Sequence, residues 1–396
     1  MKAKKSAMIY PYTNEFTPFL RYWDNDDYEI VQLVSPKGFM LHGKDASRAD
    51  MGEPLGCIVQ SDFEAGLEAI DALILVDYGS YHAPATIDNL YSDQRLDLSL
   101  RKAKAALECG KEVLCLADLG TDRTDELLAY AETTQGSIVF APKESGVANV
   151  LKTSRLKITT PVIFVMSESE NCGKFSVELG LRNALLEKGY NVSLVGSRKH
   201  GYLAGVHSVF PLMSEKIGEY EKIKKFRQYI YDLEKTEDPD VFIIGVPGGL
   251  IPFNELFHNG YGIYPYMISQ AIRPDFTILC MSHWERVNKA FFQRFEDILT
   301  YRFGSALNAI HISRMELDWQ KSEHTMTETF SRYEGSLETA LKEYKEAFAH
   351  SYDLMDSAQM DALADHIIRS LSSDENVHIL EEMGEMLSVG SIIVQQ

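Results

Sequence analysis

The chain has 396 residues, of which 45% are hydrophobic, and a formal charge of −19 from 39 basic and 58 acidic residues. This length is enough for two or three domains with cores of their own. The negative charge argues against a protein that coats nucleic acid or binds an anionic membrane surface, because phosphate groups attract Lys and Arg. A small anionic ligand stays compatible with it, since such a ligand needs only a local group of N–H donors.

Several features predict a cytoplasmic protein. No apolar stretch approaches the roughly 20 residues that cross a bilayer, and the N-terminal "MKAKKSAMIYPY" runs into a strand-like segment without a signal-peptide apolar block. The cysteines are scattered and form no CxxC pair, which favours a reducing compartment and argues against a disulfide framework or a zinc site. They are Cys57, Cys109, Cys115, Cys172 and Cys280.

The first 145 residues alternate short β-branched runs with segments of helical periodicity, a pattern typical of a parallel α/β sheet. We predict a Rossmann-like domain over residues 1–145. The predicted strands lie within 6–12, 28–36, 71–79, 112–119 and 137–142, and the predicted helices within 61–70, 99–111 and 124–136. No GxGxxG motif follows the first strand, so an NAD site has no support here.

A polar connector leads to a second α/β unit, which we predict over residues 158–318 as a P-loop NTPase-like domain with a parallel sheet. Its predicted strands lie within 161–169, 190–197, 238–249, 273–282 and 306–313, with a charged helix within 214–240. Residues 319–396 are predicted to form a helical C-terminal extension, with helices within 338–355 and 358–371.

The segment "VIFVMSESENCGKFSVELG", residues 162–180, is similar to a phosphate-binding loop. Such a loop wraps backbone N–H groups and a helix N-terminus around phosphate, while a Lys neutralises charge and a Ser or Thr binds Mg²⁺. Gly173 and Lys174 occupy the expected places between a strand and a helix. The alternative interpretation is an ordinary strand-to-helix turn with a solvated lysine.

Three residues depart from the strict motif. Glu168 stands in place of its first glycine, and Phe175 stands in place of the Mg²⁺-binding hydroxyl. Glu168 and Glu170 bring negative charge towards the phosphate position. Ser176 could supply the hydroxyl if the loop is shifted by one residue, so a bound Mg²⁺ is doubtful and no metal ligand is assigned.

A second glycine-rich loop follows the buried strand in "DVFIIGVPGGLIPF", residues 240–253. Gly248 and Gly249 allow a ligand or another backbone to come close. In α/β sheets ligands bind beyond the carboxyl ends of the strands, where this loop and the 167–174 loop are both expected.

The order of these segments resembles the P-loop class that includes dethiobiotin synthetase, whose loop is one residue longer than the strict motif. In this comparison Ser167 takes the first-glycine position, Ser169 the usual acidic position and Asn171 a further glycine position, while Gly173 and Lys174 match. The resemblance also implies an acidic metal ligand after the later strand, at the position of Gly245, and a possible homodimer.

Two further resemblances cover more of the chain. Residues 1–310 resemble a two-domain family of unknown function, some members of which are linked to D-glutamate N-acetylation, through "GYLAG" (201–205), "GVPGGLIP" (245–252) and "RPDFTILCMSHWER" (273–286). The whole chain resembles a group of bacterial peptide maturation system proteins, encoded beside small precursor peptides in natural-product clusters. That resemblance implies a pathway context.

Two other segments carry candidate residues. Arg198, in "GSRKHGYLAGVH", could pair with a phosphate or carboxylate, although a solvated basic loop is the alternative. His283 follows a strand and could act as an acid or base near neutral pH, against the commoner case of a half-buried structural histidine. The candidate binding residues are therefore Ser167, Ser169, Asn171, Gly173, Lys174, Ser176, Arg198, Gly248 and Gly249.

The sequence thus predicts a degenerate P-loop protein that binds ATP, another nucleotide or a small phosphorylated anion. The resemblance to peptide maturation system proteins implies that it serves the maturation of a ribosomally made peptide. If it is an enzyme, ATP-dependent activation or acyl transfer fits best, with weak or no ATPase activity because both usual Mg²⁺ ligands are missing. The alternative is a non-catalytic scaffold or carrier that binds a precursor peptide or a neighbouring maturation enzyme.

Overall fold

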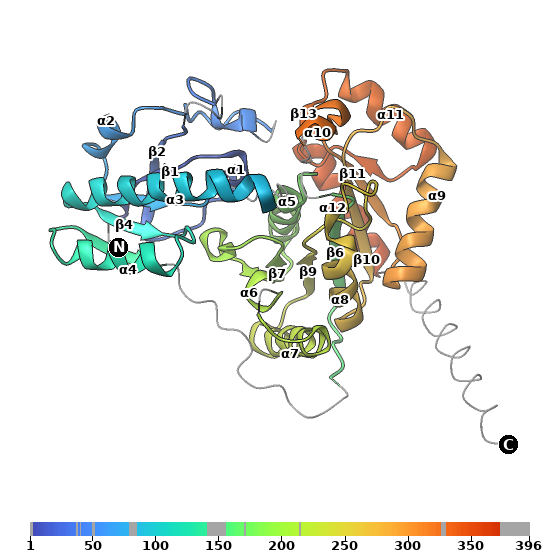
Figure 1. Ribbon diagram of the computed structural model, residues 1–396. Coiled ribbons are helices and arrows are strands. Elements are labelled where there is room, and N and C mark those ends of the chain that lie inside the picture. The colour runs from blue at the N-terminus through green and yellow to red at the C-terminus, as the bar shows by residue number, and fades with distance from the viewer. Residues whose placement is uncertain are drawn as a thin grey trace.

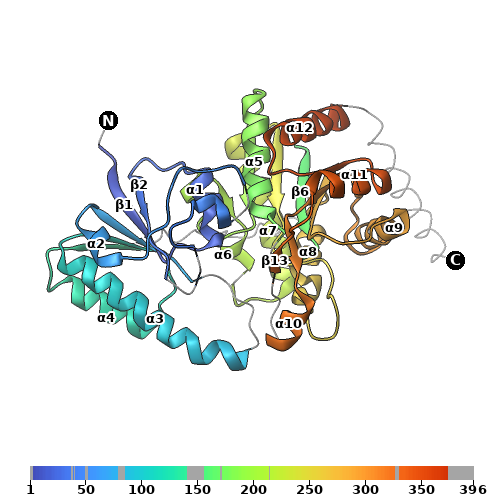
Figure 2. The same ribbon diagram turned by 90° about the horizontal axis from the view of Figure 1, so that it is seen from above.

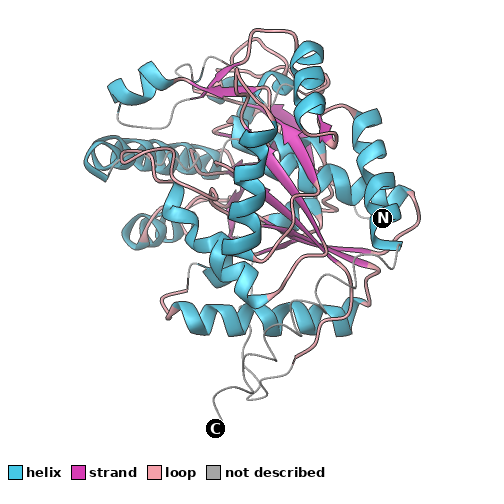
Figure 3. Cartoon of the chain, turned by 90° about the vertical axis from the view of Figure 1, so that its right-hand side faces the viewer, coloured by secondary structure: helices cyan, strands magenta, loops and turns pink. Residues whose placement is uncertain are grey.

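The computed structural model describes residues 3–36, 39, 41–49, 52–78, 85–140, 156–169, 172–213, 215–325 and 330–372. Two parallel sheets, each covered by helices, form the two halves of the chain (Figures 1 and 3). This confirms the predicted α/β class, with a Rossmann-like domain followed by a P-loop-like parallel-sheet domain. Within the described part of the chain, no helix is both long and apolar enough to cross a bilayer.

The N-terminal sheet has five parallel strands in the order β2-β1-β3-β4-β5. The strands are β1 (Lys5–Tyr10), β2 (Tyr28–Leu33), β3 (Ala72–Leu75), β4 (Glu112–Cys115) and β5 (Ser137–Phe140). The helices are α1 (Thr17–Arg21), α2 (Phe63–Leu67), α3 (Ala85–Glu108) and α4 (Thr121–Ala131). Helices α3 and α4 cover one face of the sheet, and α1 lies on the other face, towards the second domain (Figure 2).

The larger sheet has seven parallel strands in the order β14-β11-β10-β6-β9-β7-β8. The strands are β6 (Val162–Ser167), β7 (Val192–Gly196), β8 (His207–Ser208), β9 (Val241–Gly245), β10 (Phe276–Met281), β11 (Ala309–Ile312) and β14 (Ser351–Tyr352). The helices are α5 (Lys174–Glu187), α6 (Phe210–Met213), α7 (Glu219–Glu237), α8 (Ile263–Ala271), α9 (Lys289–Ile298), α10 (Trp319–Thr325), α11 (Leu337–Ala347) and α12 (Ser357–Ser372). A small antiparallel pair, β12 (Met315–Leu317) and β13 (Phe330–Arg332), stands apart from this sheet.

The sheet extends beyond the predicted domain boundary at residue 318. Strand β14 pairs with β11, and helix α11 ends at Ala347, inside the segment predicted to be one helix over 338–355. The sequence pattern does not reveal β14 because two residues are too short to show the period of a strand. The segment 319–372 is therefore mixed α and β, and residues 373–396 lie outside the described part of the chain.

Alternate residues of the central strands belong to different cores, as the pleat of a strand requires. In β6, Ile163 and Val165 face the core that contains α5 and α12, whereas Phe164 faces the core under α7, α8 and α9. The first of these cores also contains Ala7 and Ile9 of β1. The two domains therefore share a hydrophobic core.

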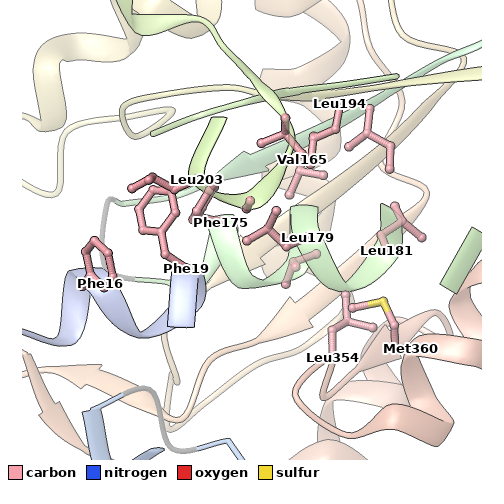
Figure 4. Packing of buried hydrophobic residues seen from close by; sticks show 14 of the residues in the cluster. Phe16, Phe19, Val165, Phe175, Leu179, Leu181, Leu194, Leu203, Leu354 and Met360 are labelled. Carbon is pink, nitrogen blue, oxygen red and sulfur yellow. The ribbon is translucent and has the colours of Figure 1, made fainter. Parts of the chain in front are cut away.

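An aromatic contact within this shared core joins the two domains. The rings of Phe19 and Phe175 are 4.9 Å apart, and Phe16 packs against Phe19 at 5.2 Å (Figure 4). Leu203 of the second domain belongs to the same cluster. Phe175 is therefore a core residue of the domain interface, which explains why the loop carries no hydroxyl at this position.

We predict that Phe19→Ala lowers the free energy of unfolding by about 3–5 kcal/mol, because it removes a buried ring from this interface. Tyr301→Ala is the matched control, since the Tyr301 side chain is 87% exposed, and it should change stability by less than about 0.5 kcal/mol. Urea denaturation of both variants measures the difference. Equal losses in the two variants would contradict an interface held together by this ring.

Candidate functional site

The carboxyl ends of β6 and β9 meet at the centre of the large sheet. Val165 pairs with Gly245, and on the other side Ser167 of β6 pairs with Cys280 of β10. The loops that follow these strands therefore start from one edge of the sheet, the edge at which α/β proteins bind ligands. Two predicted loops, 167–174 and 245–249, meet here.

Gly173 forms the turn from this loop into α5. Its φ of 73° and ψ of 11° lie in the left-handed region, and it is the N-cap of the helix that begins at Lys174. A Cβ at this position would be strained and would lie 3.3 Å from Nε2 of His311. The N–H groups of the first helical turn and the positive end of the helix dipole face the loop, which suits an anion.

Lys174 joins the two loops. Its side chain is only 3% exposed, and its Nζ donates hydrogen bonds to Oγ of Ser167 at 3.1 Å and to the carbonyl oxygen of Gly248 at 3.2 Å. The structure thus brings together three of the predicted binding residues. We call the region of Ser167, Gly173, Lys174 and Gly248 the cradle.

Glu168 turns away from the cradle. Its carboxylate accepts hydrogen bonds from the backbone N–H and the hydroxyl of Ser282 and from Nε1 of Trp284, the last at 2.9 and 3.0 Å. Burial raises the pKa of Glu168 to about 7, while these hydrogen bonds act to lower it. The Glu168 carboxylate, whose charge argued against a phosphate-binding loop, is therefore hydrogen-bonded to residues that follow β10.

Ser169, Ser176 and Gly249, three of the other predicted binding residues, lie in the segments that follow β6 and β9. The Ser169 hydroxyl and the Cys172 thiol are 3.1 Å apart, and both residues are buried. Ser176 is buried in α5 and Gly249 is buried after β9. Asn171 lies outside the described residues, as does Glu170. Burial raises the pKa of Cys172, which keeps it a neutral thiol near pH 7.

The Glu178 carboxylate lies in the space that a side chain at position 245 would occupy. A Cβ on Gly245 would lie 2.2 Å from Cδ of Glu178 and 2.3 Å from each of its oxygens. Glu178 comes from α5, is fully buried, and accepts hydrogen bonds from the N–H and hydroxyl of Ser197 at 2.9 and 2.5 Å. Burial raises the pKa of Glu178 to about 7. Sequence reasoning missed this residue, although a Glu in an otherwise apolar helix face is a signal.

Arg198 and its loop face the N-terminal domain. The Arg198 guanidinium donates to Glu15 at 2.8 Å, and the backbone N–H of Asp24 donates to the carbonyl of Leu203 at 3.3 Å. The loop that was predicted to add positive charge to the cradle thus makes a contact between domains. The predicted role of Arg198 at a phosphate stays a prediction.

His283 lies beyond Ser282, at the end of β10. Its ring stacks on Tyr333 with a centroid separation of 3.6 Å, and its Nδ1 lies 4.0 Å from a carboxylate oxygen of Glu316. Burial lowers the pKa of His283, so the ring is neutral near pH 7. Among the described residues, Nδ1 makes no hydrogen bond. Its role as an acid or base stays a prediction.

His311 is a second residue that sequence reasoning passed over. It lies in β11, is 1% exposed, and its Nδ1 accepts a hydrogen bond from the N–H of Leu354 at 3.1 Å. Burial lowers its pKa to about 4, so the ring is neutral near pH 7, and its Nε2 is the ring atom that faces Gly173. Within the described ranges, no group of three or more His, Cys, Asp or Glu side chains could hold a metal ion.

The raised pKa of Glu168 gives a stability prediction. Between its ordinary value of 4.5 and about 7, the unfolded chain releases this proton while the folded chain keeps it. Stability from this group is therefore present at low pH and is lost as the pH rises through that window. We predict that urea denaturation of wild type and Glu168→Gln at pH 5 and pH 8 gives a smaller fall for the variant. An identical fall in both proteins would contradict a buried, proton-binding Glu168.

One comparison with a solved structure agrees with this architecture. No family model matches the chain, and no curated protein sequence matches it. A solved structure of a DUF1611 family protein from Anabaena variabilis is similar, with a TM-score of 0.60 and 13% identity over 92% of this chain and 100% of that chain. An amine dehydrogenase from Mycobacterium smegmatis matches with a TM-score of only 0.26 and 14% identity, over 49% of this chain and 47% of that chain. The chain therefore has a fold similar to that of a two-domain DUF1611 family protein, a family of unknown function.

Proposed function

We propose that the protein binds a nucleotide or another phosphate-bearing anion in the cradle, and that this binding serves the maturation of a ribosomally made peptide. The observation that carries the binding proposal is the placement of charge around Lys174. The ammonium group is buried beside Gly173 and a helix N-terminus, and among the described contacts it donates to a hydroxyl and to a carbonyl oxygen.

The orientation of Glu168 supports the same proposal. A carboxylate inside the cradle would repel phosphate, but Glu168 is bonded to Ser282 and Trp284. A phosphate oxygen offers a charged acceptor, and charge-assisted hydrogen bonds are stronger than those to neutral oxygens. An anion could therefore compete with Ser167 and Gly248 for Nζ of Lys174.

The usual Mg²⁺ ligands do not fit the residues present at their two positions. Phe175 packs against Phe19 in the core, and Gly245 has no side chain. The chain can thus bind and orient an anion through Lys174 and α5, whereas the two positions that support hydrolysis in P-loop enzymes offer no oxygen ligand of their own.

The alternative proposal is a scaffold that recognises a precursor peptide or a partner enzyme. Exposed apolar side chains favour it, and they extend over the loop after β9, the start of α8 and the turn after α9. They are Leu256, Tyr261, Ile263, Tyr264, Tyr266 and Tyr301. Tyr264 lies next to Gly248, with its Cδ2 3.7 Å from the position of a Cβ on that glycine. In this alternative the P-loop architecture carries no ligand.

A thermal-shift titration with ATP, GTP, acetyl-CoA and inorganic phosphate distinguishes anion binding in the cradle from the scaffold alternative. Ligand at a hundredfold excess over Kd should raise the Tm by roughly 2–6 °C, and Lys174→Ala should remove this rise. Lys224→Ala is the control, because Lys224 pairs with Glu221 on the exposed side of α7. A rise that Lys174→Ala leaves unchanged, or no rise with any ligand, would contradict binding in the cradle and favour the scaffold.

We also predict that ATP turnover falls far below the ~1–100 s⁻¹ of typical kinases, because Phe175 replaces the hydroxyl that coordinates Mg²⁺ directly and positioned cations carry most of phosphoryl transfer. A phosphate-release assay at saturating ATP and Mg²⁺ measures it. Fast Mg²⁺-dependent turnover that disappears in Lys174→Ala would contradict this prediction, because it would require another direct Mg²⁺ ligand in place of residue 175.

A further inference from the structure

The carboxylate of Glu178 occupies the space beside Gly245, the last residue of β9, which has no side chain. P-loop enzymes carry an acidic residue at the end of a strand beside the phosphate loop, where it acts on the metal. Here that strand end is Gly245, next to β6 in the sheet. The Glu178 carboxylate fills the space that a side chain at residue 245 would enter, with Cδ 2.2 Å from the position of its Cβ.

Two more contacts fix this arrangement. A Cβ on Gly196, the last residue of β7, would lie 3.4 Å from Oε2 of Glu178, so both strand ends leave room for the carboxylate. Ser197 then holds each of its oxygens with one hydrogen bond. A buried carboxylate is costly unless it is hydrogen-bonded, and this geometry meets that requirement.

The same helix carries Lys174 and Glu178. Residues four apart lie on one face of a helix, so both side chains project from α5 towards the ends of the strands. The Lys174 and Arg198 charges act to lower the pKa of Glu178, against the larger effect of burial. In this site the lysine and the carboxylate lie on one helix. In P-loop enzymes the lysine belongs to the phosphate-binding loop and the acidic residue belongs to a strand.

We propose that Glu178 supplies, from α5, the acidic group that the site would otherwise take from residue 245, so that the cradle accepts its phosphate-bearing ligand together with Mg²⁺. Mg²⁺ keeps several of its waters in most protein sites, so a carboxylate can act on it through water. Glu178 is then a positioning residue for the metal-bound ligand. This inference rests on the proposed binding of an anion in the cradle.

The geometric part is tested without a ligand. Gly245→Ala should lower the Tm of the wild-type protein clearly, because its Cβ would meet the Glu178 carboxylate. In a Glu178→Ala background the same change should lower the Tm by less than half as much. Equal losses in the two backgrounds would overturn the assignment of this space to Glu178.

The functional part is tested by calorimetric titration of ATP with and without Mg²⁺. We expect Mg²⁺ to tighten ATP binding by about tenfold in the wild type, the effect of one hydrogen bond to a charged group. Glu178→Gln and Glu178→Ala should lose this gain while still binding ATP without metal. Glu187→Gln, at the exposed end of the same helix, is the control and should keep it.

The decisive variant places a glutamate at position 245 of β9 and removes the one at position 178. Gly245→Glu in the Glu178→Ala background should recover most of the Mg²⁺ gain, which a merely structural role of Glu178 would not produce. A folded swap variant without recovery, or a full gain in Glu178→Gln, would overturn the inference and leave anion binding intact. Absence of ATP binding in the wild type, with or without Mg²⁺, would overturn both the inference and the proposed function.

Discussion

The first two turns of helix α5 are buried on every side, and the rest of the molecule depends on this constraint. Residues 174–181 all lie inside the protein. One face of the helix carries Phe175 and Leu179 into the core shared with the N-terminal domain, where Phe19 packs. Another face carries Lys174 and Glu178 to the ends of the strands. The helix that joins the domains therefore also builds the candidate site.

Burying charged side chains at a sheet edge demands a partner for each of them. Lys174 reaches Ser167 and Gly248, Glu168 reaches Ser282 and Trp284, and Glu178 reaches Ser197. These contacts link the loops after β6, β7, β9 and β10 to one another. The cradle is thus supported by a polar network of side chains, in which two carboxylates have pKa values raised to about 7 by burial.

The sequence predicts the fold class well because the strands have clear signals. Apolar runs such as 162–167 and 276–281 are too short for buried helices and are followed by helical periodicity. The turn at Gly173 and Lys174 is also visible, since glycine, lysine and a following helix occur in the right order. The placement of Ser167, Lys174 and Gly248 next to one another then follows from the parallel order of the strands.

Other features depend on tertiary contacts that no local pattern reveals. Phe175 looks like a defect in the loop, but the ring of Phe19, more than 150 residues earlier, explains it. Glu168 looks like a repulsive charge, yet Ser282 and Trp284, in the segment that follows β10, donate hydrogen bonds to it. Glu178 and Gly245 are 67 positions apart, so their shared space is invisible in the sequence. Strand β14 is too short to show a period.

The most direct test of a built anion site is a crystal structure of the protein soaked with ATP or with phosphate. We predict phosphate density beside the N–H groups that follow Gly173, with Nζ of Lys174 moved from the Gly248 carbonyl to a phosphate oxygen and Glu168 still bound to Ser282. An empty cradle at saturating ligand, or the Glu168 carboxylate bound to Lys174 inside it, would contradict this.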